Sequence, residues 1–169
     1  MSSYKHIRST IISQYKERPQ EYREKLMKWG SEGTVTKVSR PTNLARARKL
    51  GYRAKQGVIV ARVKVSKGKS KRRQPSGGRK PSKSGKYYTR SKSMQAIAEE
   101  RATKKFSNAE VLNSYFVGDS GSHEYYEIIM LDRESPVVRA DPLYSRAISR
   151  KNRAVLGLTA SGRRHRGLM

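Results

Sequence analysis

The chain has 169 residues, no cysteine, and 39 Lys and Arg against 13 Asp and Glu, which gives a formal net charge of +26. The absence of cysteine excludes disulfides, thiol nucleophiles and cysteine-containing zinc sites. Hydrophobic residues make up only 34%, so we expect a modest core with extensions whose order depends on a partner. Nucleic acid is the natural partner for this charge, because its phosphates neutralise Lys and Arg and release counterions.

The charge is distributed in four blocks. Residues 33–98 carry 20 Lys or Arg and no acidic residue, and residues 145–169 carry seven and no acidic residue. Residues 1–32 are mixed, with seven basic and four acidic residues. Residues 99–144 reverse the balance, with nine acidic and five basic residues. We therefore expect the third block to face water or protein rather than phosphate.

Neither a membrane span nor a secretory signal is expected. No apolar run approaches the roughly 18 residues that a spanning helix requires. Residues 1–20 also lack the uninterrupted apolar segment of a signal peptide. The sequence predicts a soluble, intracellular protein with no membrane partner.

The first third of the chain predicts helices followed by strands. Residues 1–32 show helical spacing in two pieces separated by Pro19, whose ring and missing amide proton interrupt a helix. The segments 34–41 and 58–65 are strand candidates, and 44–49 has the length of one or two helical turns. The alternation in 58–65 predicts one hydrophobic face and one basic face.

A long basic segment precedes the next predicted helix. Residues 66–93 are rich in Gly, Pro, Ser and cations and lack helical or strand periodicity. Such a segment cannot bury enough apolar surface to offset its ordering entropy, so we expect a loop or arm that is disordered when free. Ser93 is suited to cap a helix over 94–105.

The remaining elements complete a small domain. VLNSYFV (111–117) and YYEIIML (125–131) alternate as two strands around a turn-rich linker, which indicates a hairpin. Asp141–Pro142 is suited to start a short helix that runs to about Arg150. The order of elements predicts an α+β fold with a mainly antiparallel sheet of about four strands, packed helices and long basic extensions. We divide the chain into an N-terminal helical segment (1–32), a core (33–66 and 93–132), a basic extended loop (67–92), and a short helix with a basic tail (133–169).

Candidates for catalysis or metal binding are weak. His6, His123 and His165 lie in three different blocks, without ligand spacing on one element. Glu99 and Glu100 point about 100° apart on a helix, so they form no acid–base pair, and we expect a solvated or salt-bridged helix face. GRKPSKSGK lacks the spacing of a phosphate loop, and no nucleophile motif occurs. We therefore predict no enzyme activity, metal, cofactor or small-molecule substrate.

Three basic elements are candidates for nucleic-acid binding: RPTNLARARKLGYRAKQG (40–57), the arm (67–92) and the tail SGRRHRGLM (161–169). Arginine forks bind phosphate bidentately or stack on bases, and glycines let the backbone approach phosphate closely. The candidate contacts are Arg40, Arg46, Arg48, Lys49, Tyr52, Arg53 and Lys55; Lys67, Lys69, Lys71, Arg72, Arg73, Arg79, Lys80, Lys83, Lys86, Arg90 and Lys92; and Arg163, Arg164 and Arg166.

Each element has a plainer interpretation. Tyr52 is suited to stacking on a base or to ordinary packing against the sheet, whereas Tyr87 and Tyr88 are candidate stacking residues. The KSKRR run within the arm is also typical of a nuclear-localisation signal or of a solvated loop. A terminal basic run can be a disordered, solubilising end.

RNA is a better match than DNA. The sequence shows no helix-turn-helix, zinc finger, RNP aromatics or G-x-x-G clamp. Basic arms without a base-reading module suit recognition of shape and backbone. These features favour a ribonucleoprotein component over its chief alternative, an architectural protein that condenses DNA. A second alternative, an RNA-processing enzyme, would need a clustered polar pocket, and these residues do not assemble one.

Four strings resemble one known family. RPTNLARARKLGYRAKQGVIVARVKV (40–65), AEERA (98–102), VLNSYFVGDSGSHEYYEIIMLD (111–132) and GLTASGRRHRGL (157–168) are similar, in order, to the archaeal and eukaryotic type of large-subunit ribosomal protein L15, the L15e family. The N-terminal block is similar more loosely. Family members usually have Arg at the position of Leu156 and continue past the final R-G-L with a further basic tail.

The resemblance implies a structural constituent of the large subunit of cytoplasmic ribosomes, acting in assembly and translation. Its implied partners are large-subunit ribosomal RNA and neighbouring ribosomal proteins. It implies an α+β core with an antiparallel sheet and RNA-embedded extensions. By position in the family's conspicuous motif, it adds Thr42 and Gln56 to the candidate RNA contacts and supports Arg40, Arg46, Arg48, Tyr52, Arg53 and Lys55.

Overall fold

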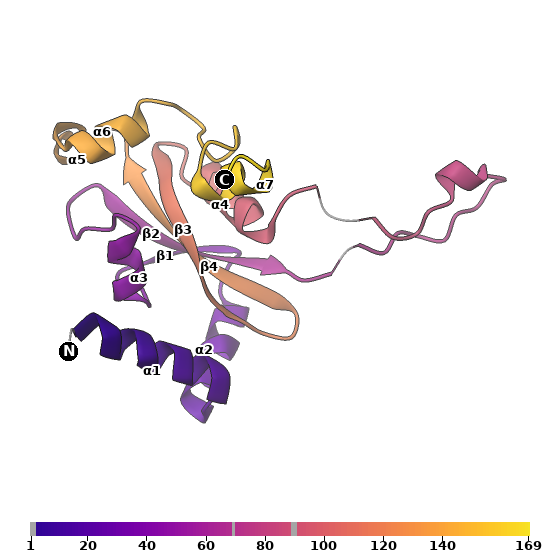
Figure 1. The fold of residues 1–169 in the computed structure, drawn as a ribbon, viewed down its shortest axis with the longest axis horizontal. Helices are drawn as coiled ribbons and strands as arrows, with labels where there is room; N and C mark the ends of the chain where they lie inside the picture. The colour runs from indigo at the N-terminus through magenta and orange to yellow at the C-terminus, as the bar shows by residue number, and fades with distance from the viewer. Residues whose placement is uncertain (1–2, 69, 89–90) are drawn as a thin grey trace.

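A computed structural model describes residues 3–68, 70–88 and 91–169. These residues form an α+β fold, which confirms the predicted class (Figure 1). Their strands make one antiparallel sheet of four in the order β1-β2-β4-β3. The strands are β1 (Val35–Val38), β2 (Val58–Ser66), β3 (Ala109–Asp119) and β4 (His123–Asp132).

The predicted helices are present, together with short ones that the pattern did not indicate. Pro19 separates the first two helices, and the Ser93 hydroxyl caps α4 by accepting a hydrogen bond from the Ala96 amide. The structure adds α5, α7 and the 3-10 helix η1. The helices are α1 (Ser3–Glu17), α2 (Gln20–Ser31), α3 (Leu44–Lys49), η1 (Pro81–Lys83), α4 (Met94–Lys105), α5 (Pro136–Ala140), α6 (Pro142–Ile148) and α7 (Ala160–His165).

Helices cover both faces of the sheet. On one face, Val63 of β2 and Ile128 of β4 pack with Ala98 of α4 in the main core. On the other face, α2 and α3 each cover part of the sheet, with Trp29 against Tyr125 and Ala47 against Ile129. This two-sided burial explains why β4 reads as a nearly continuous apolar run rather than a clean alternation.

The basic face of β2 is covered rather than presented to solvent. The Arg62 guanidinium lies 4.5 Å from the centre of the Trp29 ring and 2.9 Å from the Glu32 carboxylate. Lys64 donates to the carbonyl oxygens of Gly30 and Glu32, at 2.6 Å and 2.5 Å. These cations therefore fasten the end of α2 to the sheet.

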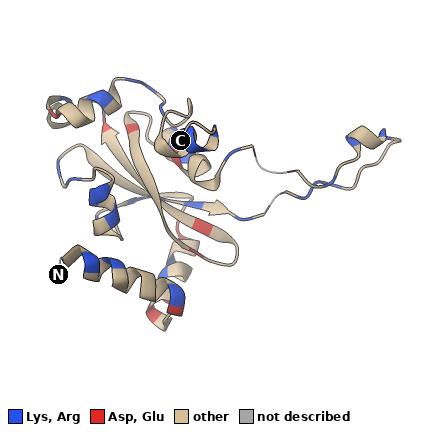
Figure 2. Cartoon of the chain, in the orientation of Figure 1, with Lys and Arg blue, Asp and Glu red and all other residues tan. Residues whose placement is uncertain are grey.

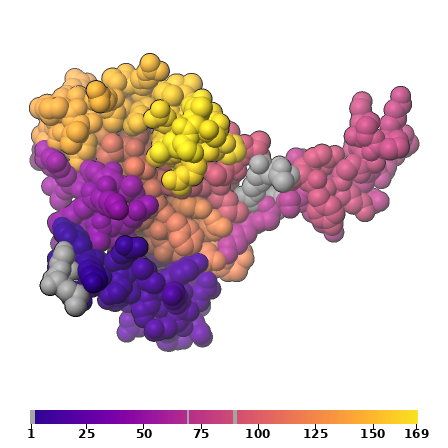
Figure 3. Space-filling view, viewed as in Figure 1, coloured from indigo at the N-terminus to yellow at the C-terminus, as the bar shows by residue number. Residues whose placement is uncertain are grey.

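The segment after β2 forms the predicted arm, a narrow ribbon that projects from the body (Figures 1 and 3). Its two legs are joined where the Arg72 amide donates to the Lys86 carbonyl, at 2.6 Å, and the Tyr88 amide to the Ser70 carbonyl, at 2.9 Å. The helix η1 lies at its far end. Disorder of this arm in the free protein stays a prediction.

Gly57 occupies a position that a larger residue would disrupt. Its φ is +81°, and a Cβ there would lie 2.5 Å from Ser135 and 2.7 Å from Val138. We expect Gly57→Ala to lower the free energy of unfolding by about 2–5 kcal/mol, from left-handed strain of about 1–2 kcal/mol and overpacking of about 1–3 kcal/mol. Urea unfolding measures the loss. Gly77→Ala is the control, because Gly77 shares the positive φ (+74°) but has no neighbour within 4 Å of the added Cβ; equal losses would contradict the role of the contact.

Candidate nucleic-acid interface

Charge is sorted between the inside and the outside of the protein. Lys and Arg lie along α1, α3, α7 and the arm, whereas several acidic residues lie on the sheet (Figure 2). The side chains of Glu99, Glu110 and Glu127 are fully buried. The buried glutamates of the acidic third block therefore face other segments of this chain, whereas Glu134 of the same block is exposed to water.

Glu127 on β4 holds the first basic element. One carboxylate oxygen accepts from the Thr42 amide at 2.9 Å and from the Tyr115 hydroxyl at 2.5 Å, and the other accepts from the Thr42 hydroxyl. Burial and the adjacent carboxylate raise the pKa of Tyr115, so its hydroxyl stays a donor. Asn43 then caps α3 by accepting from the Arg46 amide at 2.9 Å. Thr42, a predicted RNA contact, thus positions the arginines of α3.

Glu99 on α4 holds the third basic element, contrary to the expected solvated or salt-bridged helix face, whereas its neighbour Glu100 is salt-bridged to Lys92. It is 0% exposed and accepts from the hydroxyls of Ser114 and Thr159. The Thr159 hydroxyl in turn accepts from the Gly162 amide at 3.2 Å and caps α7. The start of α7 packs directly against the backbone of Gly157, and only glycine fits at position 162, because a Cβ there would lie 2.6 Å from the Gly157 Cα atom.

Glu110 on β3 holds the segment that leads to α7. Its two carboxylate oxygens accept from the backbone amides of Asn152 and Arg153, at 2.9 Å and 3.2 Å. The Arg133 guanidinium lies 3.8 Å from the same carboxylate. Each buried glutamate therefore connects the sheet or α4 to a peripheral segment.

Other carboxylates neutralise the places where basic elements join the body. Asp119 pairs with Lys67 at one root of the arm, and Glu100 pairs with Lys92 at the other. Asp141 lies 3.0 Å from Lys55 and 3.7 Å from Arg53. Lys67, Arg53 and Lys55, all predicted RNA contacts, thus already have a carboxylate partner.

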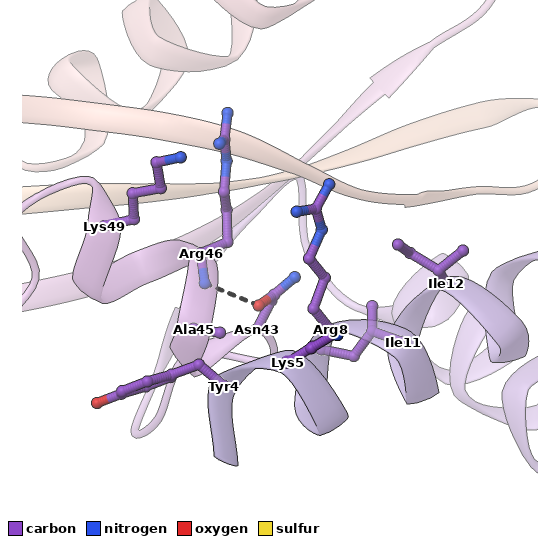
Figure 4. Close-up of a pocket in the computed structure, with 9 residues that line it drawn as sticks. All are labelled: Tyr4, Lys5, Arg8, Ile11, Ile12, Asn43, Ala45, Arg46 and Lys49. Carbon is purple, nitrogen blue, oxygen red and sulfur yellow. Dashed lines mark hydrogen bonds between the residues drawn. The ribbon is translucent and has the colours of Figure 1, made fainter. Parts of the chain in front are cut away.

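Two basic elements meet at adjacent clefts. The first, which we call the α1–α3 cleft, has a volume of about 500 Å³ (Figure 4). The second, the α3–α7 cleft, has a volume of about 270 Å³ and includes Arg164. Arg46 lines both, so cations of the first and third elements share one surface. The α1–α3 cleft is lined by Tyr4, Lys5, Arg8, Ile11, Ile12, Asn43, Ala45, Arg46 and Lys49; the α3–α7 cleft by Arg46, Leu50, Gln95, Asn113, Ser114, Tyr115, Phe116, Ala160, Ser161 and Arg164.

Most of the other predicted contacts are exposed, whereas Tyr52 is half-buried and packs against the Ala47, Tyr115 and Ile129 cluster, as the packing alternative expects. Lys86 is also half-buried. Lys69 and Arg90 lie outside the described residues. The exposed residues are Arg40, Arg46, Arg48, Lys49 and Gln56; Lys71, Arg72, Arg73, Arg79, Lys80 and Lys83 in the arm; and Arg163, Arg164 and Arg166 in the tail.

Sequence reasoning missed the cations of α1. Lys5 and Arg8 line the α1–α3 cleft, but the mixed charge of residues 1–32 concealed them. The available signal was their three-residue spacing on one helical turn, in a segment with no acidic residue before Glu17.

The described part of the chain offers neither a metal site nor a membrane-spanning helix. Within it, no group of three or more His, Cys, Asp or Glu side chains is placed to hold a metal ion. Across the same residues, no helix combines the length and apolar character of a membrane span.

Comparison with known proteins gives a family. Residues 2–169 match the protein family described as Ribosomal L15, of the L15e type. The chain belongs to this family. The large ribosomal subunit protein eL15 of Metallosphaera sedula is 47% identical over 150 residues, which cover 87% of this chain and 69% of that protein. The resemblance drawn from the four strings is thereby confirmed, and two of these strings, 40–65 and 157–168, include the segments that Glu127 and Glu99 hold.

The buried Glu99 makes stability depend on pH. Burial raises the pKa of Glu99 above its ordinary value of 4.5, and the hydrogen bonds from Ser114 and Thr159 offset part of that effect. The folded state therefore keeps this proton at pH values where the unfolded state has lost it, and the free energy of unfolding falls as pH rises through that window. Glu99→Gln should remove this fall, which is at most about 1.4 kcal/mol per pH unit.

Urea unfolding of both proteins between pH 4 and pH 8 tests this. The wild-type stability should decline relative to Glu99→Gln as pH rises above about 4.5. Glu100→Gln is the matched control, since it makes the same charge change at the neighbouring, partly exposed carboxylate that pairs with Lys92. A wild-type minus Glu99→Gln difference that stays constant or rises with pH would contradict the assignment.

Proposed function

We propose that the chain is a structural component of the large ribosomal subunit that binds large-subunit ribosomal RNA and makes contacts with neighbouring ribosomal proteins. The observation that carries this proposal is the sorting of charge: buried carboxylates hold the basic segments from inside, and among the described residues the cations of the two clefts, such as Arg46 and Arg164, make no ion pair. Membership of the L15e family supports the ribosomal setting.

The mechanism is assembly and rigidification, without bond chemistry. Phosphates of converging RNA strands repel one another, and cations placed between them allow close packing. Arg46 and Arg164 are held at one surface by α3 and α7, which Glu127 and Glu99 fix to the core. These cations need little reordering on binding, so less conformational entropy is lost.

The arm acts differently from the body. Between residues 70 and 88, where the structure describes the arm, two backbone hydrogen bonds join its legs, so RNA contact supplies much of its order. Tyr87 is 71% exposed, and the Arg72 guanidinium lies 5.4 Å from the centre of the Tyr88 ring. Exposed rings and guanidinium planes are suited to stacking on unpaired bases.

Sedimentation tests the ribosomal assignment. In a sucrose gradient of cell lysate, we expect the protein in the large-subunit peak before and after a wash at about 0.5 M salt, because many phosphate contacts and packed neighbours hold an integral component. Comigration with nucleoid DNA, or complete loss from the peak in the wash, would sink the proposal and favour the DNA-condensing alternative.

Salt dependence tests individual contacts. Arg46→Ala and Arg164→Ala should each reduce the slope of log K against log salt for structured RNA by about 0.7–0.9, since each removes about one phosphate contact. Lys25→Ala, an exposed cation on α2 outside both clefts, is the control and should leave the slope unchanged. Equal effects from all three variants would show that binding depends on net charge alone.

A competition experiment separates RNA binding from DNA binding. Displacement of the RNA by an equal nucleotide concentration of duplex DNA would favour the alternative, an architectural protein that condenses DNA.

A further inference from the structure

Helix α1 is fixed to the body near both ends, and along its length its side chains are half-buried or exposed. At its start, the Tyr4 hydroxyl accepts from the Arg48 guanidinium of α3, which lies 5.7 Å from the centre of the ring. At its end, Tyr15 and Arg18 bind Asp119, at 3.0 Å and 2.9 Å. No residue of the helix is buried. The α1–α3 cleft, lined by residues of both helices, therefore lies between these two fastened ends.

The cleft combines an apolar wall with unneutralised cations. Ile11 and Ile12 of α1 and Ala45 of α3 supply the apolar surface, and Ile12 is 43% exposed. Arg8, Arg46 and Lys49 project toward the same side of the cleft (Figure 4). No Asp or Glu is among its lining residues, and within the described chain none of these three side chains makes an ion pair.

These two features fit different parts of one ligand. Three cations on one side of a cleft without a carboxylate favour an anion, and arginine is suited to phosphate oxygens. Phosphate would not remove the exposed isoleucine surface from water. A flat nucleobase would cover that surface and so bury it. A volume of about 500 Å³ lies within the range of pockets that enclose single small molecules. RNA presents such a unit where an unpaired nucleotide leaves the stack.

We propose that the α1–α3 cleft binds one unpaired nucleotide of RNA, with the base against Ile11 and Ile12 and its phosphate between Arg8, Arg46 and Lys49. This inference rests on the proposed function and makes it more specific, since the cleft then selects a bulged or looped nucleotide rather than a regular duplex. A duplex phosphate would satisfy the cations but leave the apolar wall in water.

The test compares two RNA hairpins of equal stem sequence, one fully paired and one with a single bulged 2-aminopurine, titrated with the full chain. Wild type should bind the bulged hairpin about tenfold more tightly, because covering roughly 55 Å² of apolar wall contributes that factor at about 25 cal/mol per Å². The 2-aminopurine fluorescence should also change on binding, because the base moves from water to the wall. Ile12→Ala should reduce this preference severalfold while leaving affinity for the paired hairpin and the melting temperature unchanged, since Ile12 is exposed.

Met27→Ala is the matched control: it removes a 65% exposed apolar side chain from α2, outside the cleft, and should keep the preference. Equal wild-type affinity for the two hairpins, or an unchanged preference in Ile12→Ala, would overturn the nucleotide inference and leave ribosomal RNA binding intact. Failure of the wild type to bind either hairpin at low salt, together with absence from the large-subunit peak, would instead overturn the proposed function.

Discussion

Buried carboxylates are the constraint on which the rest of this structure depends. An ionised carboxylate costs several kcal/mol to bury unless hydrogen bonds replace its water. Here amides and hydroxyls do so: Glu127 accepts from Thr42 and Tyr115, and Glu99 from Ser114 and Thr159. Because breaking such a network leaves an unsatisfied buried group, each network strongly fixes the segment that supplies its donors.

The fixed segments are the ones that carry positive charge. Thr42 shortly precedes α3, and Thr159 is the N-cap of α7. A donor to a buried glutamate therefore lies at the start of the helix in two of the three basic elements. The arm has carboxylates only at its roots, where Asp119 and Glu100 pair with Lys67 and Lys92. Acidic residues thus relieve repulsion where chains converge on the body and leave the distal cations to phosphate.

The sequence predicted the sheet, the capped α4 and the arm because those features depend on local patterns: alternation, a Ser cap and composition. It could not predict the burial of Glu99, since that depends on α7, about 60 positions away, lying over α4. The same limit applies to Arg62, whose place on the strand was clear but whose covering by Trp29 was not. Most of the candidate RNA contacts were chosen by charge alone. They therefore include cations that already pair with a carboxylate of this chain, such as Lys55 with Asp141, as well as unpaired exposed cations.

A cation's internal partner is consequently a better guide to its role than its residue type. Arg62 and Arg46 are both arginines of the same acid-free block, yet the first holds α2 to the sheet and the second lies in two clefts with no carboxylate beside it. Moving the second into contact with phosphate breaks no internal ion pair, whereas moving the first would expose a buried network and detach a helix. In a chain with an excess of 26 positive charges, the few anions hold segments of the chain together, through amides and hydroxyls at Glu127 and Glu99 and through a cation at Glu32. The cations left without an anion are the ones available to phosphate.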